Sequence, residues 1–120
     1  MQRGMDLVRK ILLTIEAQDS ALLIIDDLVV TNYHDDMVSE HIRLMAQAGL
    51  IDVFEREFMD DTSKIALSWF GHEFLDNARN DTTWNKAKAI AGKVGSTSFA
   101  VFVHVLTGVI DAQLKAAGIP

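Results

Sequence analysis

The sequence contains no cysteine, and its single proline is residue 120. Without thiols the chain has neither a disulfide framework nor thiolate ligands for a metal. Basic residues are also scarce, because 11 Lys and Arg stand against 17 Asp and Glu and give a formal net charge of −6. This balance weighs against broad electrostatic binding of nucleic acid, whose phosphates attract cations.

Long hydrophobic runs are absent as well. The apolar cluster at residues 11–15 is interrupted by Thr14 and is too short for the hydrophobic part of a signal peptide. The longest nearly apolar run, residues 99–110, contains His104, Thr107 and Gly108, whereas a spanning helix needs about 20 apolar residues. We therefore expect a cytoplasmic protein without a membrane segment. Its 49% hydrophobic content and 120 residues suit one folded domain.

The negative charge is concentrated in one segment. Residues 20–60 hold nine acidic and two basic side chains, a sum of −7, so the rest of the chain sums to +1. A solvated face that keeps the protein soluble is the simplest interpretation of such a segment. The alternative is a surface that binds a basic partner.

Apolar spacing predicts the secondary structure. We expect helices over residues 5–17, 32–48, 70–93 and 96–117, the third interrupted at residues 80–83. A strand is expected over residues 22–30, and a hairpin over residues 50–58 and 64–69. Asn32 or Asp35 is the expected cap of the second helix, Asp81 or Thr82 that of the restart, and Gly49 a helix end. The aromatic residues expected in the core are Trp69, Phe70 and Trp84.

Two stretches resemble winged helix-turn-helix regulators. Residues 38–51, VSEHIRLMAQAGLI, resemble a recognition helix followed by the first wing strand. Residues 65–75, IALSWFGHEFL, resemble the second wing strand entering the next helix. The helix that normally precedes the recognition helix looks missing, or reduced to residues 30–35. The resemblance implies an α+β, winged helix-turn-helix-like domain with a C-terminal helical extension.

A closer resemblance covers nearly the whole chain. The opening MDLVRKILL at residues 5–13 and the string GHEFLDNARNDTTWNK at residues 71–86 are similar to an uncharacterised bacterial and prophage family, domain of unknown function 2513. The resemblance implies one domain over residues 1–120. By analogy of fold it also implies a regulatory, DNA-binding role of prophage or mobile-element origin.

The residues themselves allow two functions. DNA contacts would come from exposed polar side chains of the recognition helix and wing, here Ser39, Arg43, Gln47 and Arg56. Asp36 and Glu40 share that helix face and would repel phosphate.

The alternative function is an acidic protein-interaction module that binds or inhibits a host protein, in part by mimicking the charge of DNA. Its contacts would be the acidic residues of the wing, Asp52, Glu55, Glu57, Asp60 and Asp61.

Catalytic and metal-binding patterns are weak. Residues 72–76, HEFLD, lack the second histidine of the helical His-Glu-x-x-His zinc motif, and His34 and His41 stand seven residues apart. No glycine-rich phosphate loop is present. We expect a non-enzymatic protein with no catalytic residues, no metal and no cofactor.

The last predicted helix is apolar on most sides. Either it passes through the centre of the domain, or its outer side pairs with a second copy. We expect a homodimer, since regulators of the resembled fold often dimerise through terminal helices, and we expect His104 to be satisfied in an interface or in the core. The predicted interface residues are Val101, Val105 and Ala112.

Overall fold

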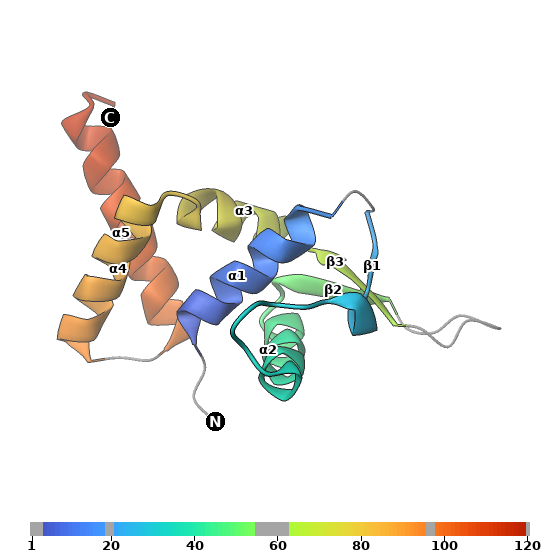
Figure 1. Ribbon diagram of the computed structural model, residues 1–120. Helices are drawn as coiled ribbons and strands as arrows, with labels where there is room; N and C mark the ends of the chain where they lie inside the picture. Colours follow the sequence, from blue (N-terminus) through green and yellow to red (C-terminus); the bar gives the residue numbers. More distant parts are fainter. Residues whose placement is uncertain (1–3, 19–20, 55–62, 96–97, 120) are drawn as a thin grey trace. The chain divides into compact units, whose positions relative to one another are not determined.

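The computed structural model describes residues 4–18, 21–54, 63–95 and 98–119 (Figure 1). These residues form an α+β structure of five α-helices and one three-stranded antiparallel sheet. The chain divides into two compact units, Met1–Leu75 and Asp76–Pro120, and the division falls within helix α3 (Trp69–Ala78). The predicted α+β class and order of elements are confirmed. The prediction of a single domain over residues 1–120 stays a prediction.

Unit 1 combines two helices with the sheet. Its helices are α1 (Met5–Glu16) and α2 (Asp35–Gln47), and its strands are β1 (Leu23–Ile24), β2 (Ile51–Phe54) and β3 (Lys64–Leu67). The strand order is β1-β3-β2, with Leu23 opposite Ile65 and Val53 opposite the same residue on the other side. Helix α1 packs against α2 and β3, and α2 packs against β2.

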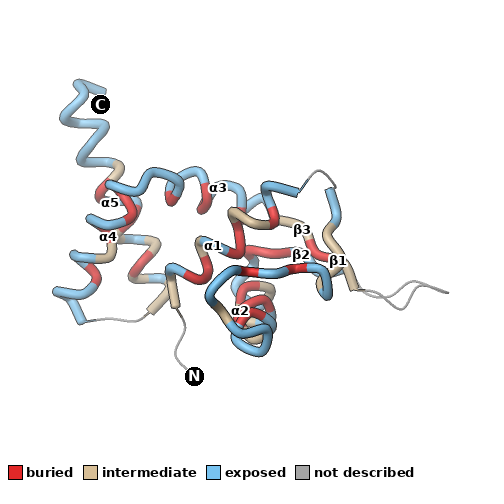
Figure 2. Tube along the Cα trace, viewed as in Figure 1, coloured by how far each residue is buried: buried red, intermediate tan, exposed pale blue. Residues whose placement is uncertain are grey.

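The core of unit 1 follows from the apolar spacing. Residues of α1 at positions 7, 8, 11, 12 and 15 form one stripe, because positions three and four apart share a helix face. Positions 38, 42 and 45 do the same for α2, and Ile65 of β3, a strand that packs against α1, is fully buried. Figure 2 shows these buried segments in the middle of α1, α2 and β3.

The first strand is shorter than the predicted residues 22–30. After Ile24 the chain enters a 3₁₀ turn, Ile25–Asp27, in which the Leu28 N–H donates to the Ile25 carbonyl at 3.3 Å. Asp26 and Asp27 are exposed on this turn, where water solvates carboxylates that suit a strand poorly. The turn redirects the chain so that Leu28 and Val30 become buried.

Two predicted helix caps are also wrong. His34 stands at the N-cap of α2 without a side-chain hydrogen bond, and Asp35 is already helical. Helix α4 (Asp81–Val94) is capped by Asn80, whose Oδ1 accepts from the Thr83 N–H at 3.0 Å. Asn80 has the extended backbone that an N-cap requires, whereas Asp81 already lies in the helix. The predicted end of α2 at Gly49 is confirmed by its φ of 82°.

The start of α3 is fixed to the turn between α2 and β2. The Ser68 N–H donates to the Leu50 carbonyl at 3.1 Å, and the Ser68 hydroxyl donates to the Gly49 carbonyl. The Gly71 N–H in turn donates to Ser68 Oγ at 2.9 Å. Gly71 lies so close that an added Cβ would stand 2.1 Å from the Leu50 carbonyl oxygen. The first turn of α3 is therefore held in one position within unit 1.

Unit 2 contains α4 and α5 (Phe99–Ala116), which pack against each other. The Trp84 ring meets the Phe102 ring edge-on, with centroids 4.9 Å apart. The Gln113 Nε2 group donates to the Thr83 hydroxyl at 3.0 Å. The core of this unit includes Trp84, Ala87, Ala91, Phe102, Leu106 and Val109.

Candidate interaction surfaces

Helix α2 presents the predicted DNA-contact residues on one exposed face. Ser39, Arg43 and Gln47 are four residues apart and all exposed, so the structure brings them together. The Arg43 Nε–H group donates to both carboxylate oxygens of Glu40 at 3.1 Å, and Nη2 donates to Glu40 Oε1. This forked ion pair lowers the pKa of Glu40, because the hydrogen bond from Arg43 favours the ionised carboxylate, and it raises the pKa of Arg43.

The beginning of α2 is acidic. Asp35 and Asp36 are exposed in its first turn, where the positive end of the helix dipole favours carboxylates. In a helix-turn-helix protein this end of the recognition helix contacts the base edges. Together with the Glu40–Arg43 pair, the two aspartates give the exposed face of α2 a negative charge.

The predicted wing is described only in part. Asp52 lies on β2 and is exposed. The remaining wing residues, Arg56 among the predicted DNA contacts and Glu55, Glu57, Asp60 and Asp61 among the acidic contacts, lie outside the described residues.

His41, considered in the sequence only as a metal ligand, links α2 to Gly4 at the start of α1. Its side chain is 1% exposed. Nε2 accepts from the Gly4 N–H at 2.9 Å, so Nδ1 carries the proton that is donated to the Met37 carbonyl at 2.9 Å. Both ring nitrogens are therefore occupied by hydrogen bonds, which assigns His41 a structural role.

The start of α3 exposes two aromatic side chains. Trp69 is 80% exposed and Phe70 is 40% exposed, so the expectation that both lie in the core is wrong; for Trp84, which is 1% exposed, it is confirmed. The buried stripe of α3 runs through Gly71, Phe74, Leu75 and Ala78. Trp69 lies off this stripe and on the same face as Glu73, four residues later.

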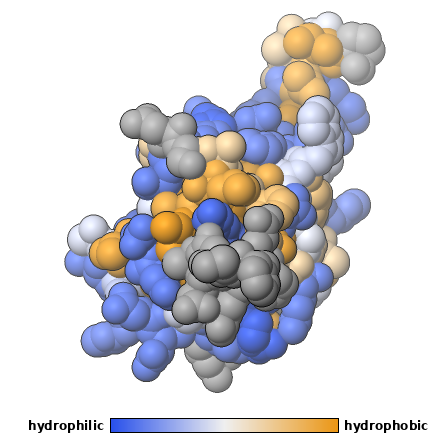
Figure 3. Space-filling model, turned by 90° about the vertical axis from the view of Figure 1, so that its right-hand side faces the viewer, coloured by the Kyte–Doolittle hydropathy of each residue, from blue (hydrophilic) through white to orange (hydrophobic). Residues whose placement is uncertain are grey.

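Apolar side chains also reach the surface beside the sheet. Figure 3 views unit 1 from the hairpin side and shows apolar side chains gathered among polar ones. The exposed apolar residues of the strands and adjoining loops are Leu22, Val29, Val53 and Phe54. Unit 1 therefore exposes apolar as well as acidic side chains.

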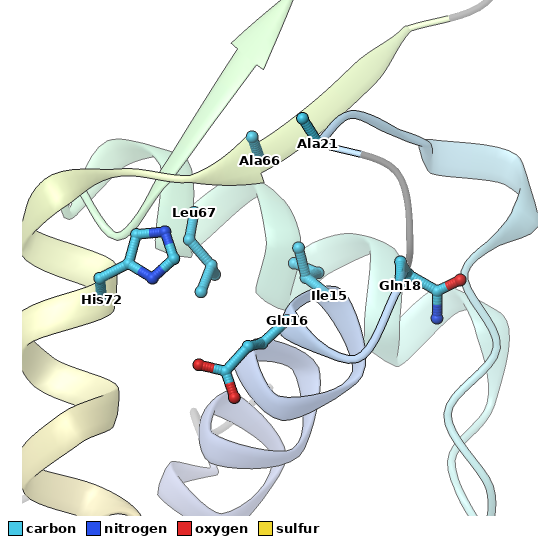
Figure 4. Close-up of a pocket in the computed structure, with 7 residues that line it drawn as sticks. All are labelled: Ile15, Glu16, Gln18, Ala21, Ala66, Leu67 and His72. Carbon is cyan, nitrogen blue, oxygen red and sulfur yellow. The ribbon is translucent and has the colours of Figure 1, made fainter.

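A shallow pocket opens between the end of α1, β3 and the first turn of α3. Its volume is about 370 Å³. Figure 4 shows the Glu16 carboxylate and the His72 ring reaching into this space from opposite helices, with Leu67 between them. The residues that line it are Ile15, Glu16, Gln18, Ala21, Ala66, Leu67 and His72. His72 of the HEFLD motif thus lies at an open, mixed surface.

Comparison with known proteins identifies the family. The model of a family described as hypothetical protein (DUF2513) matches residues 2–98. The chain belongs to the DUF2513 family. This confirms the resemblance seen in residues 5–13 and 71–86.

A protein of Haemophilus influenzae, described as uncharacterized, is 41% identical over 117 residues. The match covers 95% of this chain and 99% of that protein, so the likeness reaches into α5. No solved structure matches the chain significantly.

Metal-binding geometry is not found in the described part of this DUF2513 protein. No group of three or more His, Asp or Glu side chains is arranged there to hold an ion. His41 is occupied by two backbone hydrogen bonds, and His34 is exposed at the start of α2. His34, at the N-cap of α2, and His41, within the helix, therefore have different surroundings.

Helix α5 is long and apolar. Val101 and Val105 are half-buried, while Ala112 is exposed and His104 is exposed rather than in the core. By length and composition alone, Phe99–Ala116 is the one helix among the described residues that could cross a membrane. The same test is passed by core helices of soluble proteins.

Charge divides between the two units of the DUF2513 chain. Unit 1 contains 14 acidic and six basic residues, a net charge of −8, and unit 2 contains three acidic and five basic residues, a net charge of +2. The acidity therefore belongs to the unit that carries the sheet and α2.

Proposed function

We propose that this DUF2513 protein is a non-enzymatic, cytoplasmic protein-interaction module whose unit 1 is a winged-helix-like scaffold that binds a basic partner. The observation that carries the proposal is the forked Glu40–Arg43 ion pair. It neutralises the cation that a recognition helix would direct at DNA, and it leaves Asp35 and Asp36 to set the charge of the face.

The order of elements supports the winged-helix scaffold. Helix, strand, helix and hairpin follow one another, and β1 pairs with the second hairpin strand in an antiparallel sheet. A winged helix would place α2 in the position of the recognition helix. The 3₁₀ turn and the following loop occupy the place of the helix that usually precedes it.

The charge of unit 1 supports a basic partner. A DNA-binding surface releases counterions by placing several cations against phosphates, and a net charge of −8 opposes this. The same charge accelerates association with a basic surface and excludes acidic ones. If the partner itself binds nucleic acid, the negative charge of unit 1 would mimic the charge of DNA.

The test compares two probes of opposite charge by fluorescence anisotropy. The intact protein is titrated into a labelled oligolysine peptide and a labelled random duplex at about 50 mM salt, where phosphate binding is strongest. We expect peptide binding that weakens with salt and with the double substitution Asp35→Asn and Asp36→Asn, and no duplex binding. Duplex binding without peptide binding would overturn the proposal.

DNA binding is the second candidate function, as a regulator of prophage or mobile-element origin. It is favoured by the alignment of Ser39, Arg43 and Gln47 on one exposed face. If duplex is bound, Arg43→Ala should weaken the binding, and Glu40→Gln should strengthen it by releasing the guanidinium. If neither substitution changes the affinity for duplex, the DNA-binding surface would instead be α4, which carries Lys86 and Lys93.

We also propose that α5 pairs two copies in a homodimer. Val101 and Val105 retain part of their surface in the single chain, and Ala112 is exposed. Sedimentation of the wild type and of Val105→Glu tests this: the dimer should be lost in the variant. A wild-type chain that sediments as a monomer at high concentration would refute the pairing.

A further inference from the structure

The strongest unassigned feature of unit 1 is the exposed tryptophan at the start of α3. Trp69 is 80% exposed, the largest exposed fraction among the large hydrophobic side chains described. An indole leaves a large apolar surface in water when it has no contact, and tryptophan is strongly enriched among the residues that dominate binding energy at interfaces. The exposure of Trp69 therefore suggests that its indole ring contacts a ligand.

Glu73 lies beside this indole. The two residues are separated by one helical turn and share a face of α3, so their Cβ atoms stand about 5–6 Å apart. Glu73 is exposed. Within the described residues, neither side chain has a recorded hydrogen bond, ion pair or ring contact. An aromatic face and a carboxylate are thus presented together to solvent.

The position of this pair is fixed by the backbone around it. Ser68, just before Trp69, is hydrogen-bonded to the turn that follows α2, and the Gly71 N–H donates to Ser68 Oγ. Gly71 also lies close to Leu50, because a Cβ added at Gly71 would stand 2.1 Å from the Leu50 carbonyl oxygen. A side chain on a fixed helix start loses less conformational freedom on binding than one on a loop.

The charge of unit 1, in which 14 acidic residues stand against six basic ones, favours a cationic ligand. Arg43 is paired with Glu40 and Lys10 lies over the Tyr33 ring at 5.4 Å, while Arg9 and Lys64 also have interactions. No Lys or Arg occurs on α3 itself, and the exposed acidic residues of unit 1 include Asp35, Asp36, Asp52 and Glu73. The Glu73 carboxylate on the same face of α3 and the net negative charge of unit 1 therefore favour a cation.

We propose that Trp69 and Glu73 form a binding site for an arginine side chain of a protein partner. A guanidinium is planar and weakly hydrated, so it stacks on the indole face while its N–H groups donate to the Glu73 carboxylate. A lysine ammonium holds its water more strongly and matches a stacked geometry less well. The inference rests on the proposed binding of a basic partner and names the residue type by which that partner is recognised.

The experiment compares labelled oligoarginine and oligolysine peptides of equal length, titrated with the intact protein. We expect oligoarginine to bind about two- to fivefold more tightly, which is the size of an exposed cation–π contact. Trp69→Leu and Glu73→Gln should each remove this preference, and Trp69→Phe should keep part of it. Val29→Ala, which changes another exposed apolar residue of unit 1, is the matched control and should have no effect.

A second readout reports on the indole directly. Acrylamide should quench the exposed Trp69 far more than the buried Trp84, so the loss of emission on adding acrylamide follows Trp69. Oligoarginine should protect it from quenching more than oligolysine does. Protection that instead rises with protein concentration alone would show that a second copy covers Trp69, and would overturn the arginine site.

The outcomes separate this inference from the function on which it rests. Equal affinity for both peptides, unchanged by Trp69→Leu but reduced by Asp35→Asn and Asp36→Asn, would overturn the arginine site and leave the acidic interaction surface in place. No binding of either peptide at low salt would overturn both. Loss of binding in all surface variants would be checked against their unfolding curves, which should match the wild type.

Discussion

The two tryptophans of this DUF2513 protein occupy opposite environments in the two units. Trp84 is the fourth residue of α4, is 1% exposed and meets Phe102 edge-on. Trp69 begins α3 and is 80% exposed. Both stand in the first turns of helices, so secondary structure alone does not decide their burial. The difference lies in phase: Trp84 continues the buried stripe through Ala87 and Ala91, and Trp69 does not lie on the stripe through Phe74, Leu75 and Ala78.

The two units also differ in net charge. Unit 1 carries −8 and exposes an aromatic pair, whereas unit 2 carries +2 and uses its tryptophan to pack two helices. Large apolar side chains that serve folding are buried, and those that serve binding stay in solvent until the partner arrives. The contrast supports our proposal that unit 1 binds a partner, while Trp84 packs the two helices of unit 2.

The largest expected effect comes from removing the two indoles separately. Trp84→Ala should destabilise the fold by about 3–5 kcal/mol, because the packing of a fully buried aromatic residue is lost and a cavity remains. Trp69→Ala should change stability by no more than about 0.5 kcal/mol, as expected of a surface position. Urea unfolding followed by circular dichroism measures both. Equal losses would refute the contrast between the two residues.

Two glycines give the next largest contrast. Gly71→Ala should cost about 3 kcal/mol, because its Cβ would meet the Leu50 carbonyl oxygen at 2.1 Å and the start of α3 would have to shift. Gly92→Ala in α4 has open space at its Cβ, and alanine favours a helix by about 1 kcal/mol. Thermal unfolding should therefore move in opposite directions in these two variants. A stable Gly71→Ala protein would show that the contact is not tight.

Much of this fold is predictable from the sequence, and the features that are not predictable have identifiable physical reasons. Apolar spacing predicts the helices, and the strings at residues 5–13 and 71–86 predict the family. The length of β1 is not predictable from a run of Leu, Ile and Val, because a turn at Asp26 and Asp27 is equally compatible with that run. Contacts distant in sequence, such as His41 with Gly4 and Gly71 with Leu50, leave no local pattern.

The candidate surfaces, too, are predictable only in part from the sequence. The position of Ser39, Arg43 and Gln47 on one exposed face follows from their spacing, and so does the i,i+3 pairing of Glu40 with Arg43. The exposure of Trp69 also has a sequence signal, since the stripe of Phe74, Leu75 and Ala78 excludes it. Hydrophobicity alone predicts a buried Trp69, whereas its position relative to the apolar stripe of α3 predicts the exposure that is observed.

A smaller effect sharpens the description of unit 2. Asn80→Ala should destabilise α4 by about 1 kcal/mol, because the Thr83 N–H loses its cap. Asp81→Ala and Thr82→Ala remove neither that acceptor nor the N-cap residue, so each should cost less. Hydrogen exchange at the first turn of α4 measures the effect locally. Faster exchange in Thr82→Ala than in Asn80→Ala would show that Thr82, one of the two caps predicted from the sequence, caps α4.

The smallest effect concerns the pair on α2 and can be followed by NMR titration of the Glu40 carboxyl carbon. The pKa of Glu40 is lowered by the hydrogen bond from Arg43, so the folded protein holds the ionised form more strongly than the unfolded chain does. The stabilisation is present above the ordinary pKa of a glutamate and is lost as pH falls through the lowered value. Arg43→Ala should return the titration to the ordinary range. Since both side chains are solvent-exposed, salt should weaken the shift, and an unchanged midpoint in the variant would mean that Arg43 is free to contact a phosphate.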